Sequence, residues 1–337
     1  MIKKRIDPAS GAIIMANGIF LYGGIQAFPI MDLYLGKTLA ILLFMAWIII
    51  YSRLSIQFFQ KDFFVPFINN PVLSFTMGTW IAGVSVLCNV LLKYFPNLLP
   101  ALQVMAIINF TLWLIFLITM IKSFGRLIKK PTKYIHGVIL LSTVGTQSIV
   151  ILMKNLFSHF PDSLFQVFVI LGIIFYVAGI YLLFKRYLSV KWKLTTDWKN
   201  TNCIIHGALS ITGLAMVTAH LYSSVFLITF WIIVFSLLVV VEIIEIIRAY
   251  KRVHEFGFKK GVWTYDITQW SRNFTFGMFF AFTNALVTSE AYEIPNAIAQ
   301  LQITLLPIWA WVVLFSIIVE LIIFIQSKIN LPKTLET

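Results

Sequence analysis

Ionisable side chains within apolar stretches are the first candidates for chemistry in this sequence. A charge inside a membrane is costly and usually marks a proton relay, an ion site or a catalytic group. Three glutamates qualify, and they are Glu242, Glu245 and Glu320. Arg248 follows Glu245 at the i,i+3 spacing of helical ion pairs, so we interpret these carboxylates as pairing groups rather than as coupling groups.

Histidine and cysteine give no sign of a metal or redox site. His136, His206 and His220 lie in apolar stretches, yet no HxxxH, HExxH or DxxxD spacing brings metal ligands together. Among them, His206 is the best candidate for a ligand or proton carrier. Cys88 and Cys203 lie far apart inside apolar segments, which favours neither a disulfide framework nor a thiolate metal site. The sequence also lacks a GxSxG motif and a phosphate-binding glycine loop, so we expect no enzyme active site, no metal and no cofactor.

A phenylalanine-rich segment has the composition to obstruct a narrow pore. Five phenylalanines fall within residues 274–282, and on a helix Phe274 and Phe276 point about 160° apart. Only one of the two can therefore face a central cavity, where a phenyl ring would form an apolar plug that gates by dewetting. The alternative is that all five pack against neighbouring helices.

Basic residues gather just before this segment. Arg272 stands near its start, and the preceding loop carries Lys251, Arg252, Lys259 and Lys260. A basic vestibule at this point would concentrate anions at the inner mouth of a pore. The alternative is that these charges only orient the chain in the membrane and snorkel to its surface.

Membrane-spanning helices must position all of these residues. Of the 337 residues, 60% are apolar and 12% are charged, whereas soluble domains have about 25% charged residues, which excludes a soluble fold. Apolar stretches of about twenty residues can each cross a hydrocarbon core about 30 Å thick, and we expect a single all-α transmembrane domain over 1–337. The ten predicted spans are 8–29, 33–52, 71–92, 99–121, 134–153, 164–184, 201–221, 225–247, 270–289 and 299–326.

The distribution of positive charge predicts the orientation of these spans. An even number of spans puts both termini on one side, and 23 of the 26 Lys and Arg residues fall in the loops and tails of that side. The other side has only Lys37, Lys93 and Lys154. Since cytoplasmic loops are enriched in Lys and Arg, we expect both termini in the cytoplasm. The net charge of +13 then reports topology and does not indicate a nucleic-acid partner.

Composition separates the odd spans from the even spans. The odd spans begin near Pro8, Pro71, Lys133, Lys199 and Thr268, at steps of 62 to 69 residues, which suggests five repeated hairpins. Eleven of the 17 glycines lie in odd spans, whereas the even spans are rich in bulky aliphatic residues. We therefore predict an inner ring of odd helices around a central pore and an outer ring of even helices. The predicted pore-lining residues are Asn17, Gly18, Gly83, Thr146, Gln147, His206, Thr212, Gly213 and Gly277.

Several short motifs carry a resemblance to a known family. They are the opening Pro8 to Gly18, the run STVGTQS over 142–148, the run HGALSITGLA over 206–215, and Trp270, Ser271, Phe274 and Gly277. Together with the ten-span pattern, they resemble the tellurite-resistance and C4-dicarboxylate transporter family, which includes yeast sulfite exporters, fungal malate permeases and the slow anion channels of plant guard cells.

The resemblance implies an axial pore, a phenylalanine of the ninth helix that occludes it, and a homotrimer. The family's ninth-helix pattern places that phenylalanine at Phe274. Many members have proline next, whereas this chain has Thr275, which weakens the expected kink; Phe276 is the fallback for the plug.

Three functions are open at this point. The first is an anion channel or channel-like permease of the cytoplasmic membrane, gated by phenylalanine, with small inorganic or organic anions and the lipid bilayer as partners. The second is a proton-coupled transporter or exporter of C4-dicarboxylates, sulfite or tellurite, in which His206 would carry the proton. The third is a membrane sensor or an embedded enzyme without transport. The scarcity of carboxylates in the odd spans favours the first.

Overall fold

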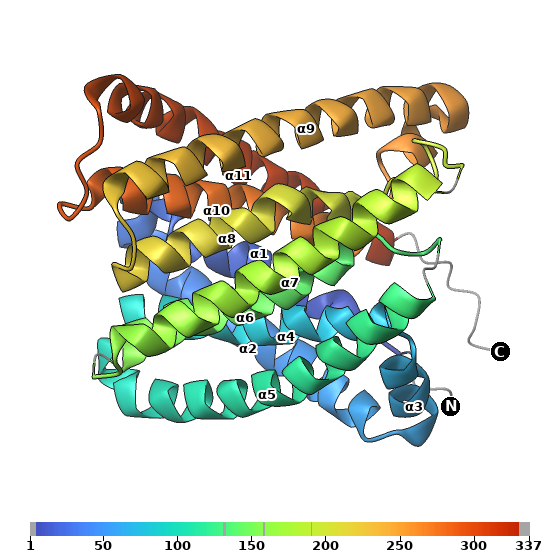
Figure 1. Cartoon of the computed structure of the whole chain (residues 1–337), viewed down its shortest axis with the longest axis horizontal. Coiled ribbons are helices and arrows are strands. Elements are labelled where there is room, and N and C mark those ends of the chain that lie inside the picture. Colours follow the sequence, from blue (N-terminus) through green and yellow to red (C-terminus); the bar gives the residue numbers. More distant parts are fainter. Residues whose placement is uncertain (1–4, 131–132, 158, 190, 330–337) are drawn as a thin grey trace.

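The computed structural model describes residues 5–130, 133–157, 159–189 and 191–329, and in this part of the chain every regular element is a helix (Figure 1). Five helices of moderate length alternate with five longer ones. The first set is α1 (Gly11–Tyr22), α4 (Met77–Tyr94), α6 (Leu141–Leu156), α8 (Ile204–Ala219) and α10 (Gln269–Thr288). The second set is α2 (Pro29–Phe58), α5 (Leu99–Lys129), α7 (Asp162–Ser189), α9 (Ser224–Gly261) and α11 (Asn296–Ile329).

Short elements complete the chain. The 3-10 turns η1 (Pro8–Ser10), η3 (Leu73–Thr76), η5 (Gly137–Leu140) and η6 (Asn200–Cys203) lead directly into α1, α4, α6 and α8. The turns η2 (Gly24–Ala27) and η4 (Pro96–Leu98) precede α2 and α5, and α3 (Lys61–Asn69) is a short helix between α2 and η3.

Nine helical stretches of the described chain are long and apolar enough to cross a membrane, as expected for a multi-pass membrane protein. The predicted span 270–289 forms a helix, α10, but it is not one of the nine. Its composition is less apolar because it includes Arg272, Asn273 and Asn284. Most of α10 is buried against protein, where polar side chains find partners that lipid does not offer.

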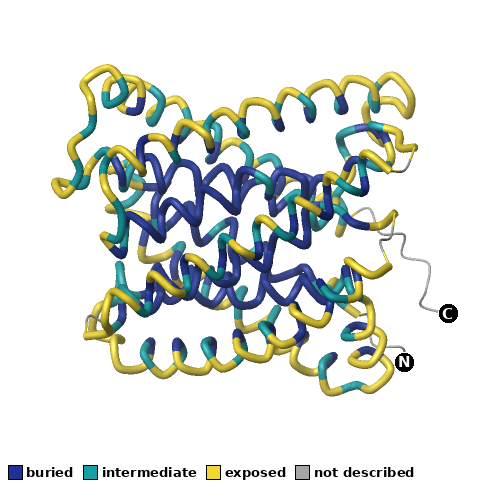
Figure 2. Tube along the Cα trace, in the orientation of Figure 1, coloured by how far each residue is buried: buried dark blue, intermediate teal, exposed yellow. Residues whose placement is uncertain are grey.

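Burial separates the two sets of helices clearly (Figure 2). The most apolar windows of the stretches containing α1, α4, α6 and α8 are 78–94% buried, whereas those of the longer helices are only 17–33% buried. The longer helices expose rows of large aliphatic side chains, such as Ile107, Ile118, Ile246 and Phe315. Exposed apolar surface on this scale is typical of helices that face lipid.

The buried helices pack on one another in a closed sequence of neighbours. α1 contacts α4, α4 contacts α6, α6 contacts α8, α8 contacts α10, and α10 returns to α1. Small residues allow two of these approaches. A Cβ on Gly11 would come within 2.7 Å of the carbonyl oxygen of Thr79, and one on Gly78 within 2.6 Å of that of Leu141. Backbone atoms cannot move aside, so these contacts require glycine.

The five helices of this ring all start at the same end of the molecule. Ala9, Thr76, Val138, Thr201 and Ser271 line one cavity at that end. The end of α11 lies there too, since Trp263 Nε1 donates to Gln326 Oε1 over 2.9 Å. The described parts of both termini therefore lie on one side.

α9 differs most from its predicted extent. The sequence predicted a span ending at 247 and a basic loop up to 272, but the helix continues to Gly261. Arg248 and Arg252 lie on this extension and bond to neighbouring segments, which stabilises helix beyond the apolar stretch. Gly257, at φ 74°, marks a break within the extension, a backbone conformation that glycine adopts without strain.

Candidate functional site

A large cavity, which we call the vestibule, lies where the five ring helices begin. Its volume is about 1010 Å³, and each of the five helices or its preceding turn contributes to the wall. The N-terminus of a helix carries a partial positive charge and free N–H groups. Five such ends around one cavity make its potential favourable to anions.

Charged side chains add to this potential. Lys130, Lys133, Arg186 and Lys199 line the vestibule, and the carboxylates that line it are those of Asp7 and Asp197. Both carboxylates are engaged locally. Asp7 Oδ1 accepts from Ala9 N over 2.7 Å, and Asp197 Oδ2 accepts from Lys193 N over 2.8 Å. Burial raises the pKa of Asp7.

His136 lies in the vestibule wall, just before the apolar stretch that begins at Gly137. Its Nδ1 lies 2.7 Å from Thr201 Oγ1 and accepts from Val138 N. Burial, followed by the nearby cations Lys199 and Arg186, lowers the pKa of His136 to about 4. His136 is therefore neutral at physiological pH.

A second, much smaller cavity lies further along the same five helices. Ile19, Ser85, Ser148, Ile211 and Met278 line it, one from each ring helix. Its volume is about 10 Å³, roughly the room that one water molecule needs. Beyond this cavity, Asn155 Nδ2 donates to Asn89 Oδ1 over 2.8 Å and ties α6 to α4.

Phe274 lies on α10 between a residue that lines the vestibule and a residue that lines the small cavity, and it is not among the lining residues of either. On α10, Ser271 lines the vestibule and Met278, seven residues later on the same face, lines the small cavity. Thr275 packs on Gly207 of α8, and Gly277 packs on Ile19 of α1. At about 100° per residue, Phe274 points between these two directions, toward the inside of the ring, and it is 1% exposed.

Phe276 points to the opposite side of α10. Its ring meets Trp309 of α11 edge-on at 5.3 Å and lies 6.5 Å from the ring of His206. Trp309 Nε1 also donates to the carbonyl oxygen of Phe276. These contacts make Phe276 a packing residue between α10, α8 and α11.

The glycines predicted to line the pore lie at contacts between helices instead. A Cβ on Gly18 would meet Val86 of α4, and one on Gly277 would meet Ile19 of α1. Gly213 lies against Phe282 of α10. Gly83 lies against the hydroxyl of Tyr51 on α2. Their small size serves close packing of helices rather than the lining of a conduit.

The predicted polar lining residues are not among the residues that line the vestibule or the small cavity. Thr146 accepts from Trp113 Nε1 of α5, and Gln147 Nε2 donates to the carbonyl oxygen of Val169 on α7. Asn17 and Thr212 donate to carbonyl oxygens of their own helices. A polar side chain inside a helical bundle gains most from a partner at hand, and these partners lie on the outer helices or on the same backbone.

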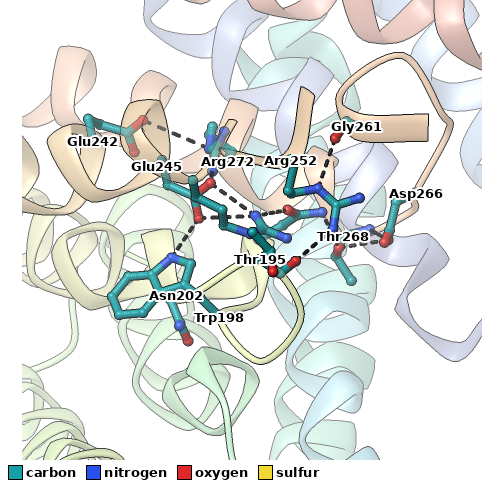
Figure 3. Close-up of polar contacts among 12 residues, drawn as sticks. Thr195, Trp198, Asn202, Glu242, Glu245, Arg252, Gly261, Asp266, Thr268 and Arg272 are labelled. Carbon is teal, nitrogen blue, oxygen red and sulfur yellow. Dashed lines mark hydrogen bonds and ion pairs between the residues drawn. The ribbon is translucent and has the colours of Figure 1, made fainter. Parts of the chain in front are cut away.

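Arg272 belongs to a compact ionic cluster between α9 and α10 (Figure 3). Arg272 Nη2 lies 2.5 Å from Glu245 Oε2, and Arg272 Nε lies 3.9 Å from Glu242 Oε2. Arg248 pairs with Glu245 at 3.1 Å, in the i,i+3 register that the sequence predicted. Two carboxylates thus lie close to Arg272, and its predicted attraction of anions at the inner mouth stays a prediction.

Two further contacts fix the cluster. Trp198 Nε1 donates to Glu245 Oε1 over 2.7 Å, and Arg248 Nη1 donates to Asn200 Oδ1 over 2.7 Å. On its other side, His206 Nε2 lies 3.6 Å from Glu242 Oε1, with the imidazole fully buried. The structure thus brings His206, Phe276 and Arg272 together on the side of the ring that faces α9 and α11.

The remaining candidate residues are the two cysteines, His220 and Glu320. Cys88 and Cys203 are buried free thiols, and the described residues contain no group of three potential ligands that could hold a metal ion. His220 ends α8 at a positive φ of 54° and stacks near Tyr292. Glu320 lines a cavity of about 530 Å³ beside the ionic cluster.

Arg186 is the vestibule residue that sequence reasoning missed. It occupies the last turn of α7, where it is indistinguishable in sequence from basic residues that merely flank a span. Only its burial, at 7% exposure, sets it apart.

Comparison with known proteins gives no identification, because no family model matches this chain and no curated protein matches it.

Proposed function

We propose that this protein is an anion channel or channel-like permease of the cytoplasmic membrane. In this proposal ten helices cross the bilayer as five hairpins, with α10 as the ninth span. The conduit follows the axis of α1, α4, α6, α8 and α10. The observation that carries the proposal is that all five helices line a cavity on each side of Phe274.

The charges of the vestibule support an anionic cargo. Four cationic side chains and five helix N-termini surround it, while its two carboxylates accept local hydrogen bonds. Such a surface raises the local concentration of small anions and disfavours cations. The small cavity adds no such charge, because the hydroxyls of Ser85 and Ser148 in its wall donate to the carbonyl oxygens of Ile81 and Gly145 on their own helices.

Phe274 is the proposed gate. An apolar ring between two axial cavities creates a short segment that water and ions cross poorly, and displacement of the ring would open it. The resemblance to the tellurite-resistance and C4-dicarboxylate transporter family supports the same residue.

Reconstituted protein tests this function. We expect currents in proteoliposomes whose reversal potential follows the anion gradient, and Phe274→Ala should raise the anion current at least several-fold. Phe276→Ala is the matched control, since it removes the same ring from the other side of α10 and should leave the current unchanged. Equal currents in wild type and Phe274→Ala, or a reversal potential set by cations, would contradict the proposal.

One contact favours the proton-coupled carrier as a second candidate. The fully buried imidazole of His206 lies 3.6 Å from the carboxylate of Glu242, which is 19% exposed, and a shorter approach of the two would let them share a proton. In that case a pH gradient would drive anion uptake, and His206→Gln would abolish the coupling while Phe274→Ala would not create a leak.

A further inference from the structure

Arg186 has an incomplete set of partners in the vestibule wall. Its Nε donates to the carbonyl oxygen of Lys133 over 2.8 Å, and its Nη2 donates to that of Asp197 over 3.4 Å. Its Nη1 is buried and has no hydrogen-bond partner. The guanidinium also packs on the ring of Tyr187, 4.3 Å from its centroid. The side chain is thus held in place with one N–H donor group unused.

No carboxylate neutralises this guanidinium within the described residues. Its protein partners are neutral carbonyl oxygens and an aromatic ring, and it takes part in none of the ion pairs of the described chain. A buried cation with an unpaired donor is costly unless something else supplies charge and an acceptor. The vestibule, which Arg186 lines, has ample room for such a group.

His136 supplies a second donor in the same wall. Its Nδ1 lies 2.7 Å from Thr201 Oγ1 and 3.4 Å from Val138 N, and the tautomer that accepts from both at Nδ1 carries the proton on Nε2. His136 and Arg186 both line the vestibule. Lys199 also lines the vestibule.

We propose that Arg186 Nη1 and His136 Nε2 form a binding subsite for a planar oxyanion, such as a carboxylate or nitrate, at the mouth of the conduit. Two N–H donors on separate elements match two oxygens of one anion better than they match a spherical halide. A guanidinium in particular favours planar, bidentate acceptors. Lys199 adds charge without fixed direction. The subsite rests on the proposed function in that the bound anion is cargo waiting at the gate.

Binding to purified protein in detergent tests the subsite directly. Thermal unfolding would be followed against sodium acetate, sodium nitrate and sodium chloride at constant ionic strength, because a ligand that binds the folded state raises the unfolding temperature. We expect acetate and nitrate to stabilise wild-type protein more than chloride does. Arg186→Gln should weaken acetate binding at least tenfold, while Lys193→Gln, which removes a nearby charge outside the vestibule wall, should leave it unchanged.

A second variant covers the case in which Arg186→Gln does not fold. Lys199→Gln changes an exposed side chain, so the packing around Arg186 is preserved. It should weaken acetate binding about threefold. Equal stabilisation by all three salts, or acetate binding that neither variant weakens, would overturn the subsite.

Measurements of anion current and of acetate binding test the proposed function and the subsite separately. Acetate binding that depends on Arg186, in protein that carries no anion current, would retain the subsite and refute the channel. Anion currents without Arg186-dependent binding would retain the channel and refute the subsite.

Discussion

Two charged regions lie side by side at one end of this molecule, and they use similar residues in opposite ways. In the ionic cluster, Arg272 and Arg248 meet the carboxylate of Glu245 at 2.5 and 3.1 Å. In the vestibule, Arg186 meets carbonyl oxygens and the ring of Tyr187 but no carboxylate, and a cavity of about 1010 Å³ separates the walls. In the cluster, oppositely charged side chains pair and hold the helices together. In the vestibule, the guanidinium of Arg186 has no carboxylate partner, and we propose that an anion binds it.

The opposite end of the molecule resembles the cluster rather than the vestibule. Lys93 lies 3.0 Å from Asp32, and Lys154 lies 2.8 Å from Asp162. None of the four cations that line the vestibule takes part in an ion pair of the described chain, which gives the proposed conduit an electrostatic direction.

The largest expected effect comes from breaking the cluster. Glu245→Gln leaves Arg272 and Arg248 without their shared carboxylate in a buried setting, and removal of one partner from a buried ion pair costs about 3–5 kcal/mol. We expect a matching fall in the free energy of unfolding, measured by denaturation in detergent. Glu255→Gln, on an exposed face of the same helix, is the control and should have little effect. A mild phenotype for Glu245→Gln would mean that the cluster is not structural.

His136 gives the vestibule a pH dependence of its own. Its folded pKa of about 4 lies below the usual value of 6.5, so the unfolded state binds the proton more readily. Stability from this group is complete above pH 6.5 and is lost as pH falls toward 4, by on the order of 3 kcal/mol. Unfolding between pH 7 and 4 should show this loss. It should diminish in His136→Gln and persist in His254→Gln, and identical pH profiles for the three proteins would contradict it.

The sequence predicted the helices well and their contacts poorly, for a physical reason. Apolar length alone selects a membrane helix, and glycine content separated the buried helices from the exposed ones. The direction of a side chain depends on its partners. Thr146 turns to Trp113 and Gln147 to Val169, both on other helices, and neither partner is visible in the local sequence.

Phe274 is a residue that the sequence could identify as a candidate, and Arg186 is one that it could not. The phenylalanine-rich segment leaves Phe274 and Phe276 as candidates and the family resemblance favours Phe274, while the contacts of Thr275 and Gly277 direct Phe274 into the ring. Arg186 stands beside Lys185 at the end of a span, and its burial depends on segments far away in the chain, around Lys133 and Asp197.

The interaction free energy between Arg272 and Glu245 also distinguishes the ionic cluster from the vestibule, and we expect it to be smaller than the effect of Glu245→Gln. Residues in one ionic network have interaction free energies of about 0.5–3 kcal/mol. The double variant Glu245→Gln/Arg272→Gln should therefore be more stable than the sum of the single losses predicts. A double-mutant cycle of unfolding free energies measures this term. Strict additivity would show that Arg272 and Glu245 do not depend on each other.

The smallest effect on stability is expected from the vestibule itself. Lys130 is exposed in its wall, and an exposed side chain away from such networks changes stability by no more than about 0.5 kcal/mol. Lys130→Gln should therefore unfold like wild type. It should nevertheless lower the anion current at low salt and lose this effect at high salt, since the Debye length falls from about 10 Å at 0.1 M to about 3 Å at 1 M. Lys259→Gln, which lies outside this wall, should leave the current unchanged at both salt concentrations. A stability loss in Lys130→Gln as large as that of Glu245→Gln would end the distinction between a region that holds helices together and one that holds charge ready for an anion.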